Sequence, residues 1–372
     1  MPANASLLVE RLAARAFRNL ALVELRPGPR LNVISGENGQ GKTSLLEALY
    51  LVATTRSFRT ERLLEAIQHG AERAEVLASV SEGGVSREQR AELASRARRF
   101  TIDGQRARSA AAHALATPVV VFHPGDLELV AGAATSRRRL LDRVALHRDP
   151  ASGEARRRYA EALRERKALL ERGGPTALGL SEFEEVAVRH GVALARARRG
   201  AAGALAERLG ALFPGVAPPG LELVAAYEPG GVEDVVAFRD ELARRRGQDE
   251  RRGSASFGPH RDELALALEG RPARTHASQG QQRLLALALT LAELDCVREA
   301  RAVEPLLLLD DVSSELDPAR TEAVHGLLER AVGQVFVTTT RPELIGGGGA
   351  GGRRDFVVER GAVREVLAGR AG

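Results

Sequence analysis

Gly36-Glu37-Asn38-Gly39-Gln40-Gly41-Lys42-Thr43 is the stretch that decides the fold of this chain. It has the spacing of a phosphate-binding P-loop, in which a glycine and four further residues precede Gly-Lys-Thr. The apolar run 31–34 predicts a buried strand before the loop, and apolar residues at three- and four-residue steps predict a helix over 42–52 after it. Glycines let backbone N–H groups surround a phosphate, and the N-terminus of the following helix adds partial positive charge. This strand–loop–helix unit predicts a nucleoside triphosphate site.

The loop and the first helical residues supply the candidates for holding ATP and Mg²⁺. Lys42 is expected to reach the β- and γ-phosphates as a compact charge, and the Thr43 hydroxyl to ligate magnesium. Lys42 is one of only two lysines among the 54 lysines and arginines of the chain. It stands where a planar guanidinium does not fit the phosphate cradle. The predicted nucleotide-binding residues are Gly36, Glu37, Asn38, Gly39, Gln40, Gly41, Lys42, Thr43 and Ser44.

A second, acidic half of such a site follows the apolar run 306–309, which predicts a buried strand. Asp310 is predicted to hold magnesium together with Thr43. Asp311 is predicted to polarise the attacking water as a general base. We call Asp310 and Asp311 the acidic pair. Asp310 lies 268 positions after Lys42, which is too far for a compact small GTPase or a simple kinase. An insertion must therefore separate the two halves of the site.

Three further short sequence motifs are arranged in the order of one class of ATPase. Ser278-Gln279-Gly280-Gln281-Gln282-Arg283 opens a helix predicted over 281–300, where a serine and a glycine form an anion-binding corner, although the same residues are equally a capped helix start. Ser313-Ser314-Glu315-Leu316-Asp317 precedes a helix predicted over 317–331, and Val337 to Thr340 ends a strand predicted over 335–339. The order of these strings resembles the ABC-type ATPase heads. In that class the signature serine faces the γ-phosphate bound to the partner chain, which makes Ser278 to Gln281 the signature candidates and Lys42, Asp311 and Ser278 the catalytic candidates.

The middle of the chain differs from its flanks. Residues 136–213 are rich in Ala, Leu, Glu and Arg with few β-branched residues, which predicts helices, the longer ones broken near Gly191, Gly200 and Gly203. The flanks predict alternating strands and helices. The predicted fold is therefore an α/β ABC-type P-loop ATPase head, split by an insertion, with a smaller helical arm. The predicted domains are residues 1–135 (head with the P-loop), 136–215 (helical arm) and 216–372 (head with the signature and the acidic pair).

Composition excludes several classes of protein. One cysteine, Cys296, excludes a disulfide scaffold and a cysteine-based zinc site. No run of 18 uncharged apolar residues is present, and residues 1–11 lack the layout of a signal peptide, so we expect a cytoplasmic protein without membrane contact. The net charge is +5 and aromatic residues make up 3%. If nucleic acid is the partner, phosphate contacts to duplex are therefore favoured over base stacking on single strands.

The arginines form five runs that are candidates for such contacts. Each run, taken singly, is also explained as a solvated helix face with glutamate neighbours, and the sequence does not decide between the two. The runs are Arg96 with Arg98 and Arg99, Arg106 with Arg108, Arg156 to Arg158, Arg196 with Arg198 and Arg199, and Arg244 to Arg246.

Over nearly its full length the chain resembles the RecF family of bacterial recombination-mediator ATPases. The matching strings are Phe17-Arg18-Asn19, the P-loop, Arg56-Ser57-Phe58-Arg59, Phe122-His123-Pro124-Gly125-Asp126-Leu127, Arg137 to Asp142, Phe257-Gly258-Pro259-His260-Arg261-Asp262, Ser278 to Arg283 and Leu306 to Asp317. The resemblance implies a head with a helical arm and a weak, DNA-stimulated ATPase that forms an ATP-dependent homodimer. It also implies binding to duplex DNA and single-strand/double-strand junctions, a role in the DNA-damage response, and partnership with RecR and RecO in loading RecA at gaps.

Two other functions are open at this point. The ATPase subunit of a membrane transporter explains the P-loop, the signature and the acidic pair equally well, but it explains neither the helical insertion nor the basic charge. A DNA-binding scaffold with an idle ATP site is the third reading, although all four of Lys42, Thr43, Asp310 and Asp311 are present. Thr338 to Thr340 stand where ABC heads in general carry a histidine, which leaves the residue that senses the γ-phosphate open.

Overall fold

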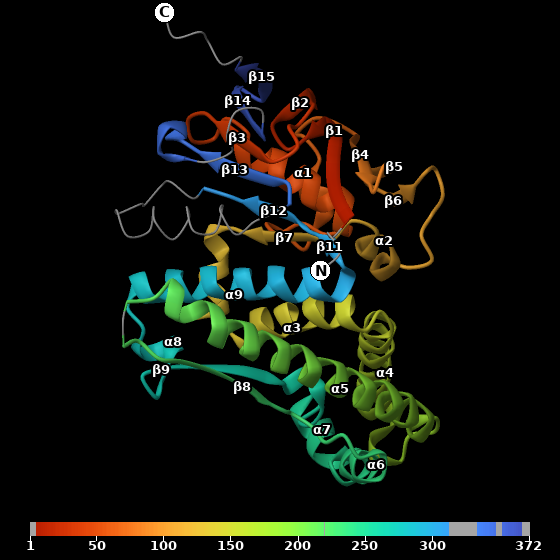
Figure 1. Ribbon diagram of the computed structural model, residues 1–372. Helices are drawn as coiled ribbons and strands as arrows, with labels where there is room; N and C mark the ends of the chain where they lie inside the picture. Colours follow the sequence, from red (N-terminus) through yellow and green to blue (C-terminus); the bar gives the residue numbers. More distant parts are fainter. Residues whose placement is uncertain (1–4, 219, 312–332, 347–351, 367–372) are drawn as a thin grey trace, which may run out of the picture. The chain divides into compact units, whose positions relative to one another are not determined.

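The computed structural model describes residues 5–218, 220–311, 333–346 and 352–366. The chain forms two compact units: unit 1 comprises residues 1–125 and 297–372, and unit 2 comprises residues 126–296 (Figure 1). We predicted that residues 216–296 belong to the ATPase head. In the structure they lie in the same compact unit as the helices from the middle of the chain. The reason is that strand β8 (Leu223–Glu228) packs on helix α5 (Leu180–Leu212), and β9 (Glu263–Leu268) on α3 (Ala134–Arg148).

Unit 1 contains a mostly parallel sheet that carries both halves of the predicted site. Its strands are, in spatial order, β15 (Ala362–Val366), β14 (Arg353–Glu359), β3 (Leu31–Ser35), β13 (Val335–Thr339), β12 (Leu306–Leu309) and β7 (Val119–Phe122). All neighbours are parallel except β14 and β15, which form an antiparallel hairpin. The P-loop follows β3 and the acidic pair follows β12, so both emerge at the carboxyl edge of the sheet with only β13 between them.

A second sheet completes unit 1. It runs β11 (Val303–Glu304), β1 (Ala5–Phe17), β4 (Arg73–Glu82), β5 (Val85–Ala94) and β6 (Ala97–Ile102), and β2 (Leu20–Leu25) also pairs with β1. Helix α1 (Lys42–Thr54) shares one hydrophobic core with strands of both sheets and is buried at nearly every position. A helix that is apolar on all sides is typical of such a central position. The short helix α2 (Ala110–Ala116) follows β6.

Unit 2 is built mainly of helices. They are α3, α4 (Ala151–Gly173), α5, α6 (Val235–Arg244), α7 (Arg246–Arg252), α8 (Ala273–His276) and α9 (Gln279–Arg301), which continues into unit 1. A small antiparallel sheet of β10 (Arg271–Pro272), β9 and β8 accompanies them. Among the described helices, none has the length and apolar character needed to cross a membrane.

The predicted breaks in the long helix are wrong, because α5 runs without interruption over its 33 residues. Glycine within a helix costs about 1 kcal/mol relative to alanine, and packing against α4 and α6 offsets this cost. At Gly191 the glycine is needed for the packing itself. A Cβ there would lie 2.9 Å from Phe238 Cζ and 3.0 Å from Tyr159 Cε2, closer than side chains pack.

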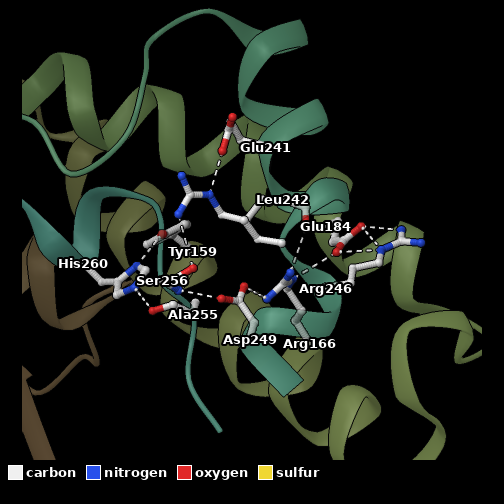
Figure 2. Close-up of polar contacts among 11 residues, drawn as sticks. Tyr159, Arg166, Glu184, Glu241, Leu242, Arg246, Asp249, Ala255, Ser256 and His260 are labelled. Atoms are coloured by element: carbon white, nitrogen blue, oxygen red, sulfur yellow. Dashed lines mark hydrogen bonds and ion pairs between the residues drawn. The ribbon is translucent and has the colours of Figure 1, made fainter. Parts of the chain in front are cut away.

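Buried ion pairs join helices α4, α5 and α7 of unit 2 (Figure 2). Arg166, which is 1% exposed, donates to Glu184 at 3.0 Å and to Asp249 at 2.7 Å. Beside this network, the His260 ring is bonded to the Tyr159 hydroxyl at 2.8 Å and, through Nε2, to the carbonyl of residue 255 at 3.0 Å. Burial lowers the pKa of His260, so the ring is kept neutral. His260 is therefore a packed polar turn residue of unit 2.

Candidate nucleotide-binding site

The P-loop has the backbone that the sequence predicts. Gly36 and Gly41 adopt φ values of 148° and 121°, which favour glycine. At Gly36 a side chain is also excluded by space, since a Cβ would lie 2.4 Å from the Val358 carbonyl oxygen of β14. Helix α1 begins at Lys42, so the N–H groups of its first turn have no partner within the helix and face the loop.

Lys42 is folded back into the loop. Its ammonium group donates to the carbonyl oxygens of Gly36 at 2.7 Å and Glu37 at 2.8 Å. Burial lowers the pKa of Lys42, while the charges of Asp311 and Asp310 oppose that shift. The lysine is thus held beside the acidic pair.

The acidic pair is organised by two hydroxyl groups. Asp310 Oδ1 accepts hydrogen bonds from Thr43 Oγ1 at 2.9 Å and from Thr338 Oγ1 at 2.7 Å. Burial raises the pKa of Asp310, and the two hydroxyl bonds oppose that shift. Asp311 has a φ of 51° and donates its N–H to Thr338 Oγ1 at 2.8 Å. The structure therefore brings together Lys42, Thr43, Asp310 and Asp311, residues up to 269 positions apart in sequence.

These residues fit Mg²⁺ and ATP by the chemistry of their donor groups. A hydroxyl and a carboxylate are the hard oxygen ligands that magnesium takes, and a buried carboxylate with a raised pKa is stabilised by a nearby cation. A cavity of about 550 Å³ opens in front of them, within the size range of ligand sites. Its lining includes Asn38, Gly39, Gly41, Lys42, Thr43, Ser44 and Asp311.

Two neighbouring segments hold the P-loop. Asn19 donates to the Gly39 carbonyl at 3.0 Å and accepts from Ser44 Oγ at 2.9 Å. Gln40 accepts two backbone N–H groups from the β14–β15 turn: Gly361 donates to its carbonyl at 2.9 Å and Arg360 to its side chain at 2.5 Å. The predicted loop residues are thus tied both to the β1–β2 turn and to the C-terminal hairpin.

A buried glutamate on α1 binds residues from two of the sequence motifs that carry the family resemblance. Glu47 is fully buried and binds Arg18 through two hydrogen bonds of 2.9 and 2.7 Å. It also accepts from Ser57 Oγ at 2.6 Å and from Arg59 at 3.2 Å. Arg18 and Arg59 line the same cavity as the P-loop. Sequence reasoning gave these residues no role, although a lone glutamate inside an apolar helix is a usable signal for a buried partner.

The signature residues lie in unit 2, at the start of α9. Ser278 Oγ accepts from the Gln281 N–H at 3.2 Å, and the Gln281 side chain accepts from the Ser278 N–H at 2.8 Å. This reciprocal pair is a capping box. The cap uses the hydroxyl as an acceptor and leaves its proton available for donation. Gln279 and Gly280 form the first turn of the helix between the two capping residues.

Two of the predicted strings fall elsewhere. Ser313 to Asp317 and the helix predicted over 317–331 lie outside the described residues. Thr338 was a candidate to sense the γ-phosphate, but it is fully buried and its hydroxyl is used by Asp310 and Asp311. Thr338 therefore positions the acidic pair.

Comparison with known proteins gives one consistent result. The family model described as RecF/RecN/SMC N terminal domain matches residues 8–349. The DNA replication and repair protein RecF of Anaeromyxobacter sp. (strain Fw109-5) is 42% identical over 366 residues, covering 96% of this chain and 98% of that protein. The protein of the same name from Anaeromyxobacter dehalogenans (strain 2CP-1 / ATCC BAA-258) is 44% identical over 349 residues, covering 90% and 92%.

Solved structures agree with these relatives. The recombination mediator protein RecF-ATP in the RecFOR pathway has a TM-score of 0.87 and 26% identity, with 98% of this chain and 99% of that chain covered. The Smc head domain of Pyrococcus furiosus, with a TM-score of 0.56, 14% identity and coverage of 97% and 96%, shares the fold alone.

Proposed function

Because this chain belongs to the RecF family of DNA replication and repair proteins, we propose that it is an ATP-dependent DNA-binding protein of recombinational repair and replication restart. It binds ATP with Mg²⁺, dimerises on DNA near single-strand gaps, hydrolyses ATP slowly and helps to load the RecA recombinase. Its partners are duplex DNA and single-strand/double-strand junctions, a second copy of the chain, and RecR with RecO. It acts in the cytoplasm.

The observation that carries the proposal is the set of bonds around Asp310. A P-loop threonine, a carboxylate at a strand end and Lys42 meet at one edge of the sheet. A buried carboxylate lowers the stability of the fold. A scaffold with an idle ATP site would not explain why such a residue is present. This favours a working ATP site over a vestigial one. Membership of the family, in turn, separates the protein from transporter ATPase subunits, which share the P-loop.

Each residue then has a task. ATP with its magnesium ion supplies the γ-phosphate that water attacks. Lys42 and the N–H groups at the start of α1 would bind the phosphates, and Thr43 and Asp310 would hold the metal. Asp311 accepts the proton of the attacking water at its carboxylate. Ser278 donates its hydroxyl proton to the γ-phosphate bound by the partner chain, so that ATP joins the two copies and hydrolysis releases them.

The test is binding to a fluorescent gapped duplex, with and without ATP and Mg²⁺. We expect ATP to strengthen binding of the unaltered chain. Lys42→Ala abolishes the effect of ATP, because the phosphates lose their cation. Asp311→Asn keeps the ATP-dependent increase in DNA binding, because ATP binds but is not hydrolysed. Binding that is indifferent to ATP in the unaltered chain would leave the scaffold as the correct function, and no binding in any condition would exclude DNA as the partner.

A further inference from the structure

The five arginine runs separate into two kinds once their neighbours are known. Most arginines of the three runs in unit 2 pair with carboxylates; the exceptions are Arg156, which lies 4.0 Å from Asp142, and Arg196, which donates to the backbone carbonyl of Glu233. Arg157 and Arg158 pair with Glu154 at 2.6 and 2.9 Å, and Arg199 pairs with Glu233 at 2.5 Å. The same holds for Arg198, which is buried against Asp142 and Asp262, for Arg244 and Arg245, which pair with Glu241, and for Arg246, which pairs with Glu184.

The other two runs lie together in unit 1 and are not neutralised. They occupy the β5–β6 turn, β6 itself and the loop that follows, residues 95–108, which we call the arginine hairpin (Figure 1). Its five arginines, Arg96, Arg98, Arg99, Arg106 and Arg108, are all exposed. Within the described part of the chain, only Arg99 among them has a charged partner, Glu92 at 4.0 Å, the limit of an ion pair.

Acidic residues do not offset this charge. The only acid in the arginine hairpin is Asp103, and its carboxylate already accepts the N–H of Glu88 at 2.7 Å. On the neighbouring strand β5, by contrast, Arg90 is paired and lies 3.1 Å from both Glu75 and Glu88. The arginine hairpin therefore concentrates unpaired positive charge at the outer end of the sheet.

We propose that the arginine hairpin is the surface on which this protein binds the phosphate backbone of duplex DNA, an inference that rests on DNA being the partner as proposed above. Exposed guanidinium groups bind phosphates through charge-assisted, often two-fold hydrogen bonds. They read no sequence, which suits a protein that acts at gaps of any sequence. The one aromatic ring in the segment, Phe100, packs inward against His113 and the core. The surface thus lacks a platform for stacking single-strand bases, and duplex is the expected ligand.

A purely structural role for these arginines has a different consequence. The edge strand β6 exposes unpaired backbone groups, and charged side chains on such a strand prevent it from pairing with another chain. On that account, removing the charges causes aggregation and leaves DNA binding by the remaining monomer unchanged.

The test measures duplex binding by the full chain over a range of salt concentrations, with ATP and Mg²⁺. The variant Arg96→Gln/Arg98→Gln/Arg106→Gln removes three charges from the arginine hairpin. We expect the slope of log affinity against log salt to flatten by about 0.9 for each phosphate that the variant no longer neutralises, and affinity near 100 mM salt to fall at least tenfold. The matched control Arg157→Gln/Arg158→Gln/Arg244→Gln removes the same charge from paired positions and should leave both quantities unchanged.

Two further measurements separate the loss of phosphate binding from aggregation and from binding of an acidic protein. A variant with lysine at the same three hairpin positions keeps the charge and should keep the salt slope, even if the glutamine variant aggregates. A 20-residue polyglutamate peptide tests whether the surface takes an acidic protein instead. Two results would overturn the inference. One is an unchanged salt slope in the glutamine variant; the other is a glutamine variant that no longer binds the peptide but still binds duplex normally. Absence of duplex binding by the unaltered chain would instead show that the proposed function itself is wrong.

Discussion

Asp310 is buried between two hydroxyl groups, at a place where a charge is costly unless a cation is present. Its pKa is raised by burial. A carboxyl group whose pKa is higher in the folded state stabilises the fold below its unfolded pKa, and this contribution is lost as the pH rises through the folded pKa. When it is ionised, Asp310 therefore destabilises the fold of the protein without nucleotide.

We predict that Asp310→Asn stabilises the nucleotide-free protein. The amide oxygen still accepts from Thr43 and Thr338, and the buried charge is gone. The melting temperature should rise by a few degrees at pH 8, and the difference from the unaltered chain should shrink as the pH falls toward 5. ATP with Mg²⁺ should raise the melting temperature of the unaltered chain but not of the variant. Thermal melts at both pH values, with and without the ligand, measure this, and a variant that melts lower than the unaltered chain at pH 8 contradicts it.

Thr338 offers a second prediction at this scale. Thr338→Val removes the hydroxyl that joins Asp310 to the Asp311 N–H, and leaves both groups with an unmet hydrogen bond. We expect a loss of about 1–3 kcal/mol in the free energy of unfolding and at least a tenfold fall in kcat, while Thr338→Ser restores both. Thr290→Val is the control, because Thr290 is equally buried but bonds only to the Ala286 carbonyl within α9. Equal effects of the valine and serine variants on kcat would contradict the positioning role.

At the scale of elements, strands and helices with regular spacing were predictable and irregular ones were not. Strands β3 and β12 appear where the apolar runs 31–34 and 306–309 predicted them. Strand β1 was missed because its register shifts between Val9 and Arg11, which moves the buried positions from 7 and 9 to 12 and 14 and breaks the alternation. The sequence could suggest that Glu47 has a buried partner, but the identity of its partners, like the contact of the β14–β15 turn with Gln40, depends on residues that only the tertiary fold brings together.

The β14–β15 turn is predicted to act on nucleotide binding, although it lies more than 300 residues after the P-loop. Gly361 has a φ of 77°, and a Cβ there would lie 2.1 Å from the Asn19 carbonyl oxygen, beside the P-loop. We expect Gly361→Ala to push the turn away from Gln40 and Asn19, and to weaken ATP binding at least tenfold. Fluorescence titration with a labelled ATP analogue measures the affinity.

Gly104 provides a matched control for that substitution. It has a φ of 76°, and it also follows a residue with a φ of 49°, but a Cβ there meets nothing within 4 Å. Gly104→Ala therefore carries the same backbone strain without the crowding. If both alanine variants bind ATP equally, the effect comes from strain alone, and the turn has no particular influence on the P-loop.

At the scale of the whole molecule, the catalytic candidates divide between the two units. Lys42, Thr43, Asp310 and Asp311 belong to unit 1, and Ser278 belongs to unit 2. Their order in the sequence predicted a nucleotide site and an insertion. The extent of unit 2 was not predictable, because strands β8 and β9 look like head strands in sequence yet pack on helices α5 and α3. The capping box on Ser278 satisfies the start of α9 within its own chain, so a role for this serine across a dimer needs a test that separates the two copies.

Mixing two inactive variants provides that test. In the proposed two-fold symmetric dimer, each ATP site would take Lys42 from one copy and Ser278 from the other. Lys42→Ala and Ser278→Arg should each abolish DNA-stimulated ATPase activity alone. A dimer of one copy of each contains one site with both residues intact, so an equimolar mixture should recover up to about a quarter of the unaltered activity if the copies pair at random. Phosphate release measures the rate. A mixture as inactive as its components would show that Ser278 does not act on the partner's nucleotide, whereas activity in Ser278→Arg alone would show that it is only a helix cap.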